Sequence, residues 1–135
     1  MVMGSFKEIV YAIARNSKCE KKQVGAIIVK GGRIISSGYN GTPRGYHNCN
    51  EIKKDDHRSW QFEHEIHAEM NAILWAARSG IAIEGATMIT TTEPCTQCAK
   101  HIANSGIKKV IYFDSYPVSG VKFLRDCGIV VEKGE

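Results

Sequence analysis

The sequence has few of the features that mark membrane, secreted or disordered proteins. It contains 3 prolines in 135 residues, and its longest apolar runs, such as residues 24–29, are far too short to span a bilayer. Residues 1–17 place Lys7, Glu8 and Arg15 around a short apolar stretch, which is not the layout of a signal peptide. We therefore expect a cytoplasmic protein that is neither secreted nor inserted in a membrane.

A strong charge of one sign is also lacking. The formal net charge is +4, from 18 basic and 14 acidic side chains, and no dense basic stripe is present. This mild balance favours an anionic small molecule over a nucleic acid as the partner. Lys18, Lys21 and Lys22 form the densest basic cluster, which is either a solvated face or a phosphate site.

The apolar content is sufficient for one globular domain over residues 1–135 without disulfide bonds. Hydrophobic residues make up 43% of the chain and charged residues 24%. The five cysteines are an odd number in a chain without an export signal, which argues against a disulfide framework. Reduced thiols are buried core residues or metal ligands, and the spacing of Cys95 and Cys98 favours metal binding.

Hydrophobic periodicity predicts alternating helices and strands. A capping box from Ser5 to Glu8 begins the first helix, and Gly31 and Gly32 join the first two strands in a hairpin. Strands are expected at residues 24–29, 34–37, 86–92, 109–113 and 129–131, and the later helices at 65–78, 95–104 and 121–126. Strand–helix–strand connections make the later strands parallel. The sequence therefore predicts an α/β fold, a three-layer α/β/α sandwich around a five-stranded mixed sheet.

The segment from residue 38 to residue 64 has no clear periodicity and is too long for an idle loop in a compact domain. It contains Asn40, Arg44, His47, Cys49 and His57. We interpret it as a functional loop.

Two short motifs carry candidate chemistry. His67 and Glu69 form an H-x-E motif at the start of a predicted helix, and Pro94, Cys95 and Cys98 form a P-C-x-x-C motif just after a strand. Cys95 and Cys98 lie on one side of the first helical turn, where the helix dipole favours thiolates. Together with His67 they give zinc three ligands and leave one position open, as in catalytic zinc sites.

Glu69 would then supply the proton transfers. A carboxylate beside the open position can take a proton from water and deliver it to an amino-substituted ring. Other interpretations remain open for the separate motifs. C-x-x-C alone is typical of a structural zinc half-site or a redox pair, and His67 and Glu69 alone suit the polar face of an acidic helix.

Both motifs together match H-x-E…P-C-x-x-C, the signature of zinc-dependent nucleobase deaminases. Over nearly its whole length the chain resembles the cytidine and deoxycytidylate (dCMP) deaminases, in particular those of T-even phages. The resemblance rests on residues 23–26 (QVGA), 38–45 (GYNGTPRG), 48–49 (NC) and 66–73 (IHAEMNAI) as well as on the two motifs.

The resemblance implies zinc-dependent hydrolysis of dCMP to dUMP and ammonia. His67, Cys95 and Cys98 would bind the catalytic zinc, and Glu69 would move the protons. Asn40 would contact the deoxyribose, the backbone at Ala68 would contact the pyrimidine edge, and Tyr116 would close over the nucleotide. By itself Asn40, between Tyr39 and Gly41, is equally well a turn residue with positive φ.

The same resemblance implies a second, structural zinc site formed by Cys19, Cys49, His57 and Glu65. An independent physical reason is that four ligands would fix the long segment from residue 38 to residue 64 to the rest of the domain. The alternative is two unpaired thiols among surface polar groups.

The resemblance further implies a homohexamer that dCTP, with Mg²⁺, activates and dTTP inhibits. The effector would bind at Gly38, Tyr39, Gly41 and Arg44, where glycines allow close approach of a triphosphate. Two other functions stay open at this point: a tRNA adenosine deaminase, and a zinc-binding module without catalytic activity.

Overall fold

The computed structural model describes residues 3–19, 21–51, 53 and 55–135. The helices are α1 (Met3–Ala14), α2 (His57–His64), α3 (Ala68–Arg78), α4 (Thr96–Ala103) and α5 (Val121–Asp126), and a 3-10 turn covers Cys49–Glu51. The strands are β1 (Gly25–Lys30), β2 (Arg33–Tyr39), β3 (Thr87–Thr92), β4 (Lys109–Asp114) and β5 (Val130–Lys133).

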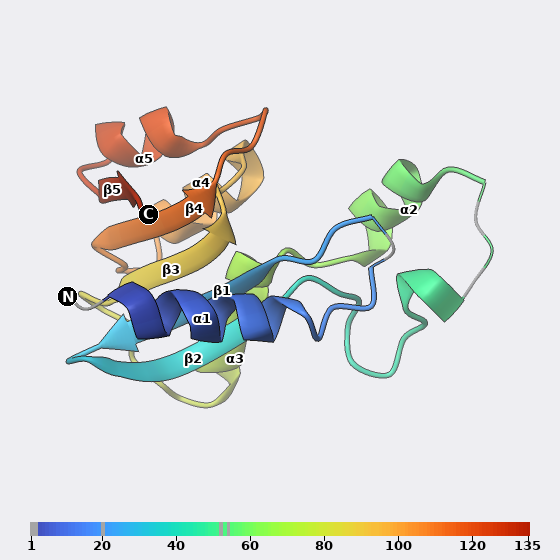
Figure 1. The fold of residues 1–135 in the computed structure, drawn as a ribbon, viewed down its shortest axis with the longest axis horizontal. Coiled ribbons are helices and arrows are strands. Elements are labelled where there is room, and N and C mark those ends of the chain that lie inside the picture. Colours follow the sequence, from blue (N-terminus) through green and yellow to red (C-terminus); the bar gives the residue numbers. More distant parts are fainter. Residues whose placement is uncertain (1–2, 20, 52, 54) are drawn as a thin grey trace.

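The five strands form one mixed sheet in the order β2-β1-β3-β4-β5 (Figure 1). β1 pairs antiparallel with β2 and with β3, whereas β3, β4 and β5 are parallel to one another. The hairpin between β1 and β2 turns at Gly31 and Gly32, whose φ angles of 59° and 76° suit glycine. The predicted mixed sheet is confirmed.

Helices cover both faces of the sheet. Ile27 and Val29 of β1 pack with Val10 of α1 on one face. Ala26 and Ile28, the alternate residues of the same strand, pack on the other face with α3, α4 and α5. β1 is therefore buried on both sides, as a central strand should be. These two clusters confirm the predicted three layers.

The structure corrects the predicted starts of two helices and adds one helix that was not predicted. α1 already includes Met3, so Ser5 lies inside the helix and is not its N-cap. α2 was missing from the predicted order because none of its eight residues, all of them described, is fully buried. Without a buried face the helix has no apolar periodicity. α3 begins at Ala68 rather than at Glu65, because Glu65 is the extended C-cap of α2.

The described residues between 42 and 64 form a lobe that projects beyond the sheet (Figure 1). Paired backbone bonds between Gly41 and Ile66, at 3.1 and 2.8 Å, close its neck. Inside the lobe, His64 stacks between Tyr46 and Trp60, with ring centroids 5.4 and 4.9 Å away.

Among the described residues, no helix combines the length and apolar character needed to cross a membrane.

Candidate metal centre and substrate cavity

The two predicted motifs meet where two helices begin. His67 is the N-cap of α3 with extended backbone, and Cys95 is the N-cap of α4, just past the end of β3. The Cys95 sulfur accepts the backbone N–H of Cys98 at 3.5 Å. The helix N-termini therefore bring partial positive charge to the place where thiolates are needed.

The spacing of the three ligand atoms suits zinc. The Nδ1 atom of His67 lies 3.2 Å from the Cys98 sulfur and 3.4 Å from the Cys95 sulfur. Tetrahedral zinc with normal bond lengths would separate a nitrogen and a sulfur ligand by about 3.6 Å. Cys95 and Cys98 are free thiols rather than a disulfide. Two sulfurs and one imidazole are donors that zinc prefers, so the residues fit this metal.

The thiols of this centre differ in acidity. The hydrogen bond from the Cys98 thiol holds the pKa of Cys95 well below its usual value, and the same bond raises the pKa of Cys98. The hydrogen bond to Cys95 also raises the pKa of His67. Cys95 is thus the first sulfur to ionise, and metal binding must displace the proton that remains on Cys98.

Glu69 lies next to this centre without belonging to the ligand group. Only 4% of the residue is exposed, and burial raises the pKa of its carboxyl to about 7. Glu69 follows His67 by two residues in the first turn of α3. A carboxyl whose pKa lies near neutrality can both accept and donate a proton, which is what a proton shuttle requires.

A cavity adjoins the candidate metal centre. Its walls include His67, Glu69 and Cys95 as well as two lysines of the segment between α1 and β1. The lining residues are Lys21, Lys22, Val24, Asn40, Gln61, His67, Ala68, Glu69, Thr92, Glu93, Cys95 and Tyr116. The cavity therefore contains all three predicted substrate-contacting residues, Asn40, Ala68 and Tyr116.

Asn40 is not the positive-φ turn residue that was one of its two interpretations, because no non-glycine residue in the described chain has positive φ. It is 5% exposed and its amide fixes the neighbouring segment. The amide oxygen accepts the N–H of Val24 at 2.8 Å, and the amide nitrogen donates to the carbonyl of Lys22 at 2.9 Å. Asn40 therefore ties β2 to one wall of the cavity.

Tyr116 follows the end of β4, as the sequence predicted. The ammonium of Lys22 lies 5.2 Å from the centroid of its ring. This distance is within the range of a cation–π contact. The aromatic ring of Tyr116 and the ammonium group of Lys22, both of which line the cavity, are therefore in contact with each other.

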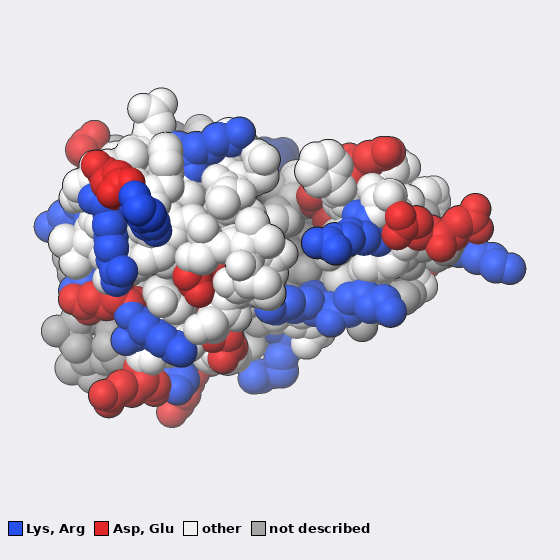
Figure 2. Space-filling model, turned by 90° about the horizontal axis from the view of Figure 1, so that it is seen from above, with Lys and Arg blue, Asp and Glu red and all other residues white. Residues whose placement is uncertain are grey.

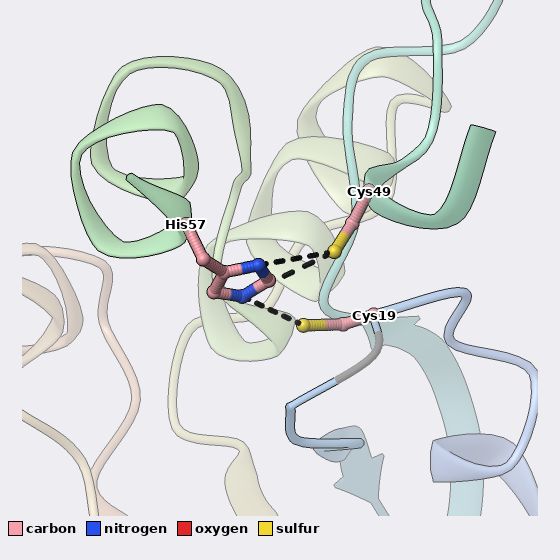
Figure 3. A group of neighbouring side chains, drawn as sticks. All are labelled: Cys19, Cys49 and His57. Atoms are coloured by element: carbon pink, nitrogen blue, oxygen red, sulfur yellow. Dashed lines mark hydrogen bonds between the residues drawn. The ribbon is translucent and has the colours of Figure 1, made fainter. Parts of the chain in front are cut away.

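A second group of possible metal ligands lies at the base of the lobe. Cys19, Cys49 and His57 point toward one another (Figure 3), with ring nitrogens of His57 3.8 Å from the Cys19 sulfur and 3.5 Å from the Cys49 sulfur. Glu65 lies outside this group. The side-chain amide nitrogen of Gln61 contacts both this group and Glu65, at 3.5 Å from the Cys19 sulfur and 3.0 Å from a Glu65 oxygen.

The predicted effector residues line a second cavity on the other side of Asn40. Gly38, Tyr39, Gly41 and Arg44 all border it. The full lining is Lys18, residues 37–46, Asn48, Ile66, Asn71, Leu74, Trp75 and Arg78. Of the three lysines that the sequence grouped together, Lys18 lines this cavity, whereas Lys21 and Lys22 line the cavity over the metal centre.

Sequence reasoning missed several residues of both cavities. Gln61 was hidden because α2 was not predicted. Glu93 could have been noticed, because it directly precedes the P-C-x-x-C motif. Arg78 and Trp75 lie on the outer side of α3, where periodicity identifies only the buried face.

Comparisons with known proteins agree with this geometry. Residues 3–114 match the family model of the cytidine and deoxycytidylate deaminase zinc-binding region. The deoxycytidylate deaminase of Enterobacteria phage T4 is 40% identical, over 97% of this chain and 89% of its own length. The dCMP deaminase of cyanophage S-TIM5, solved with dCMP and dUMP, has a TM-score of 0.83 at 34% identity, covering 96% of this chain and 94% of its own.

The chain therefore belongs to the cytidine and deoxycytidylate deaminase family. The chain carries the H-x-E…P-C-x-x-C signature of zinc-dependent deaminases, and three residues of that signature, His67, Cys95 and Cys98, form a group that could hold a metal ion.

Metal analysis of purified variants tests the ligand group of His67, Cys95 and Cys98. We expect His67→Ala and Cys95→Ala to lose the zinc of the catalytic centre, because each removes one of three ligands. Glu69→Gln should keep that zinc, since the carboxylate is not a ligand. Zinc content is measured by plasma mass spectrometry, and full zinc retention in Cys95→Ala would contradict the assigned ligand set.

Proposed function

We propose that the protein deaminates dCMP to dUMP and ammonia. The observation that carries the proposal is that one cavity joins the hydrolytic centre, His67, Cys95 and Glu69, to the ammonium groups of Lys21 and Lys22. A pyrimidine at the centre would leave its 5′-phosphate toward the lysines. Relatives of similar fold and nearly full overlap are named for this activity.

The reaction needs a water molecule and a group that moves both protons of that water to the substrate, one to a ring nitrogen and one to the amino group. Zinc held by His67, Cys95 and Cys98 would supply a water activated for addition to the ring carbon that carries the amino group. Glu69 takes one proton from the water and gives it to the adjacent ring nitrogen. It then takes the remaining proton from the hydroxyl group that has added to the ring carbon and gives it to the amino group, which leaves as ammonia while the new carbonyl forms.

The walls of the cavity would orient the nucleotide. The backbone at Ala68 lies in the first turn of α3 and would contact the pyrimidine edge, and Asn40 would contact the deoxyribose. Tyr116 would cover the ring of the nucleotide. Figure 2 shows basic side chains gathered where the lobe adjoins the main body, which suits an anionic substrate.

Replacement of the proton carrier is the direct test of this chemistry. Glu69→Gln should release ammonia from dCMP at least about 10²-fold more slowly than the parent protein, because the amide cannot carry the protons. Its zinc content serves as the control. A variant with intact zinc and near-normal turnover would exclude Glu69 as the proton carrier.

Phosphate recognition predicts which substrate is preferred. The parent protein should favour dCMP over deoxycytidine, cytidine and a tRNA anticodon stem-loop in kcat/KM. Lys22→Ala should weaken that preference by about tenfold, since it removes one charge contact to phosphate. Lys30→Ala, at the far end of β1, is the matched control. Preference for the stem-loop would instead identify a tRNA deaminase. If none of the four substrates releases ammonia, the protein is a zinc-binding module without catalytic activity.

We propose that a structural zinc binds Cys19, Cys49 and His57. The three ligand atoms come from the segment after α1, from the 3-10 turn and from α2. A metal there would fix the lobe to the main body. Glu65 would complete the set if the side chain of Gln61, which donates to it at 3.0 Å, moved aside. Two zinc ions per chain, falling to one in Cys49→Ala, would support this site.

Regulation by nucleoside triphosphates is proposed for the second cavity. Lys18, Arg44 and Arg78 give it positive charge, and Gly38 and Gly41 bring backbone close to a ligand. We propose that the protein assembles as a homohexamer, in which dCTP with Mg²⁺ activates the deamination of dCMP and dTTP inhibits it. Asn40 lines both cavities, so a ligand that orders one wall would influence the other.

Saturation curves test this regulation. With dCMP alone we expect a sigmoidal rate curve, which becomes hyperbolic with dCTP and Mg²⁺ and is suppressed by dTTP. Arg44→Ala should weaken both effects while its rate at saturating dCMP stays close to the parent value. A hyperbolic curve that neither triphosphate changes would show that the chain lacks this control.

A further inference from the structure

Glu93 is a buried acidic residue that the chemistry above does not use. It stands between the end of β3 and Pro94 and is 9% exposed. One carboxylate oxygen accepts the backbone N–H of Tyr116 at 3.1 Å, and the other accepts the hydroxyl of Ser119. Both partners belong to the loop between β4 and α5, which also supplies the aromatic wall of the cavity.

Backbone contacts tie the same loop to the metal-binding segment at both ends. The N–H of Glu93 donates to the carbonyl of Asp114 at 2.8 Å, and the N–H of Gly120 donates to the carbonyl of Pro94 at 2.8 Å. A β-bridge joins Cys95 to Ser119. The carboxylate of Glu93 adds hydrogen bonds to the part of the loop between these two ends, and one of them holds the backbone of Tyr116.

The surroundings of Tyr116 show why this anchor matters. Its ring lines the cavity and lies against Lys22, while its backbone is bound to Glu93. Hydrogen bonds to a charged acceptor are stronger than neutral ones. A loop that is ordered before the substrate arrives does not have to be ordered by it, and this lowers the cost of binding.

We propose that Glu93 is a positioning residue that holds Tyr116 in its place on the cavity wall and thereby supports nucleotide binding rather than proton transfer. Both oxygens of Glu93 are already occupied by donors from the loop, whereas proton transfer belongs to Glu69. The expected effect is therefore on KM. This inference rests on the proposed function, because it takes dCMP as the ligand of the cavity.

The experiment measures kcat, KM and zinc content for dCMP deamination. Glu93→Ala should raise KM about tenfold, with kcat within about twofold of the parent value and zinc unchanged. Glu93→Gln should restore most of the affinity, because an amide oxygen still accepts the Tyr116 N–H. Asp126→Ala removes an exposed carboxylate of α5 and is the matched control, with KM unchanged.

A double-mutant cycle separates positioning from general damage to the fold. In a Tyr116→Ala background the Glu93→Ala change should add less than about twofold to KM, since its effect passes through the Tyr116 ring. An unchanged KM in Glu93→Ala with intact zinc overturns the proposal. So does a loss confined to kcat, or a full additional effect in the Tyr116→Ala background.

Amide hydrogen exchange gives a readout that needs no substrate. The Tyr116 amide should exchange faster in Glu93→Ala than in the parent, and the Gly120 amide, which is bound to Pro94, should not change. If the parent protein does not convert dCMP, the proposed function fails, and unchanged exchange at Tyr116 separately overturns the anchoring role. Glu93→Asp, whose shorter side chain draws the carboxylate back from the Tyr116 N–H and the Ser119 hydroxyl, replaces Glu93→Ala if that variant does not fold.

Discussion

The N-termini of α3 and α4 point to one place, and the remaining features of the site depend on that meeting. His67 and Cys95 cap the two helices, and their ligand atoms are 3.4 Å apart. Close packing of α3 against the sheet makes this meeting of the two helix N-termini possible. A Cβ atom on Gly38 of β2 would lie 2.5 Å from the Ala72 backbone nitrogen, so only glycine lets α3 approach β2 this closely.

The sheet topology places the other functional groups around this point. β3 and β4 are parallel, so Glu93 and Cys95 after one strand and Tyr116 after the next lie at the same edge of the sheet. β1 is antiparallel to both β2 and β3, so β2 runs in the same direction as β3 and Asn40, which follows β2, lies at that same edge. The strand order therefore makes three features neighbours: the candidate metal centre, the cavity wall that contains Tyr116, and the candidate effector cavity.

The regular part of the fold was predictable because its residues are buried in regular patterns. β1 alternates between two apolar clusters, and α5 was predicted with its observed bounds, Val121–Asp126. The closeness of Cys95 and Cys98 was predictable because their spacing places both sulfurs in one helical turn. The hairpin at Gly31 and Gly32 was likewise predictable, from its turn residues.

What the sequence did not reveal lies where burial gives no pattern. α2 has no fully buried residue among its eight, so its place in the lobe follows from contacts such as the stacking of His64 on Tyr46. The division of Lys18 from Lys21 and Lys22 between two cavities depends on which way the chain turns after α1. No local propensity determines that turn.

The central claim is that water adds to the amino-bearing carbon of dCMP at the centre formed by His67, Cys95, Cys98 and Glu69. The most direct measurement is mass spectrometry of the product formed by the zinc-loaded protein in ¹⁸O-labelled water. The account predicts dUMP that carries one ¹⁸O atom in the pyrimidine ring carbonyl, with one ammonia released for each dUMP. No conversion of dCMP by the zinc-loaded protein, or dUMP without the label, would contradict it.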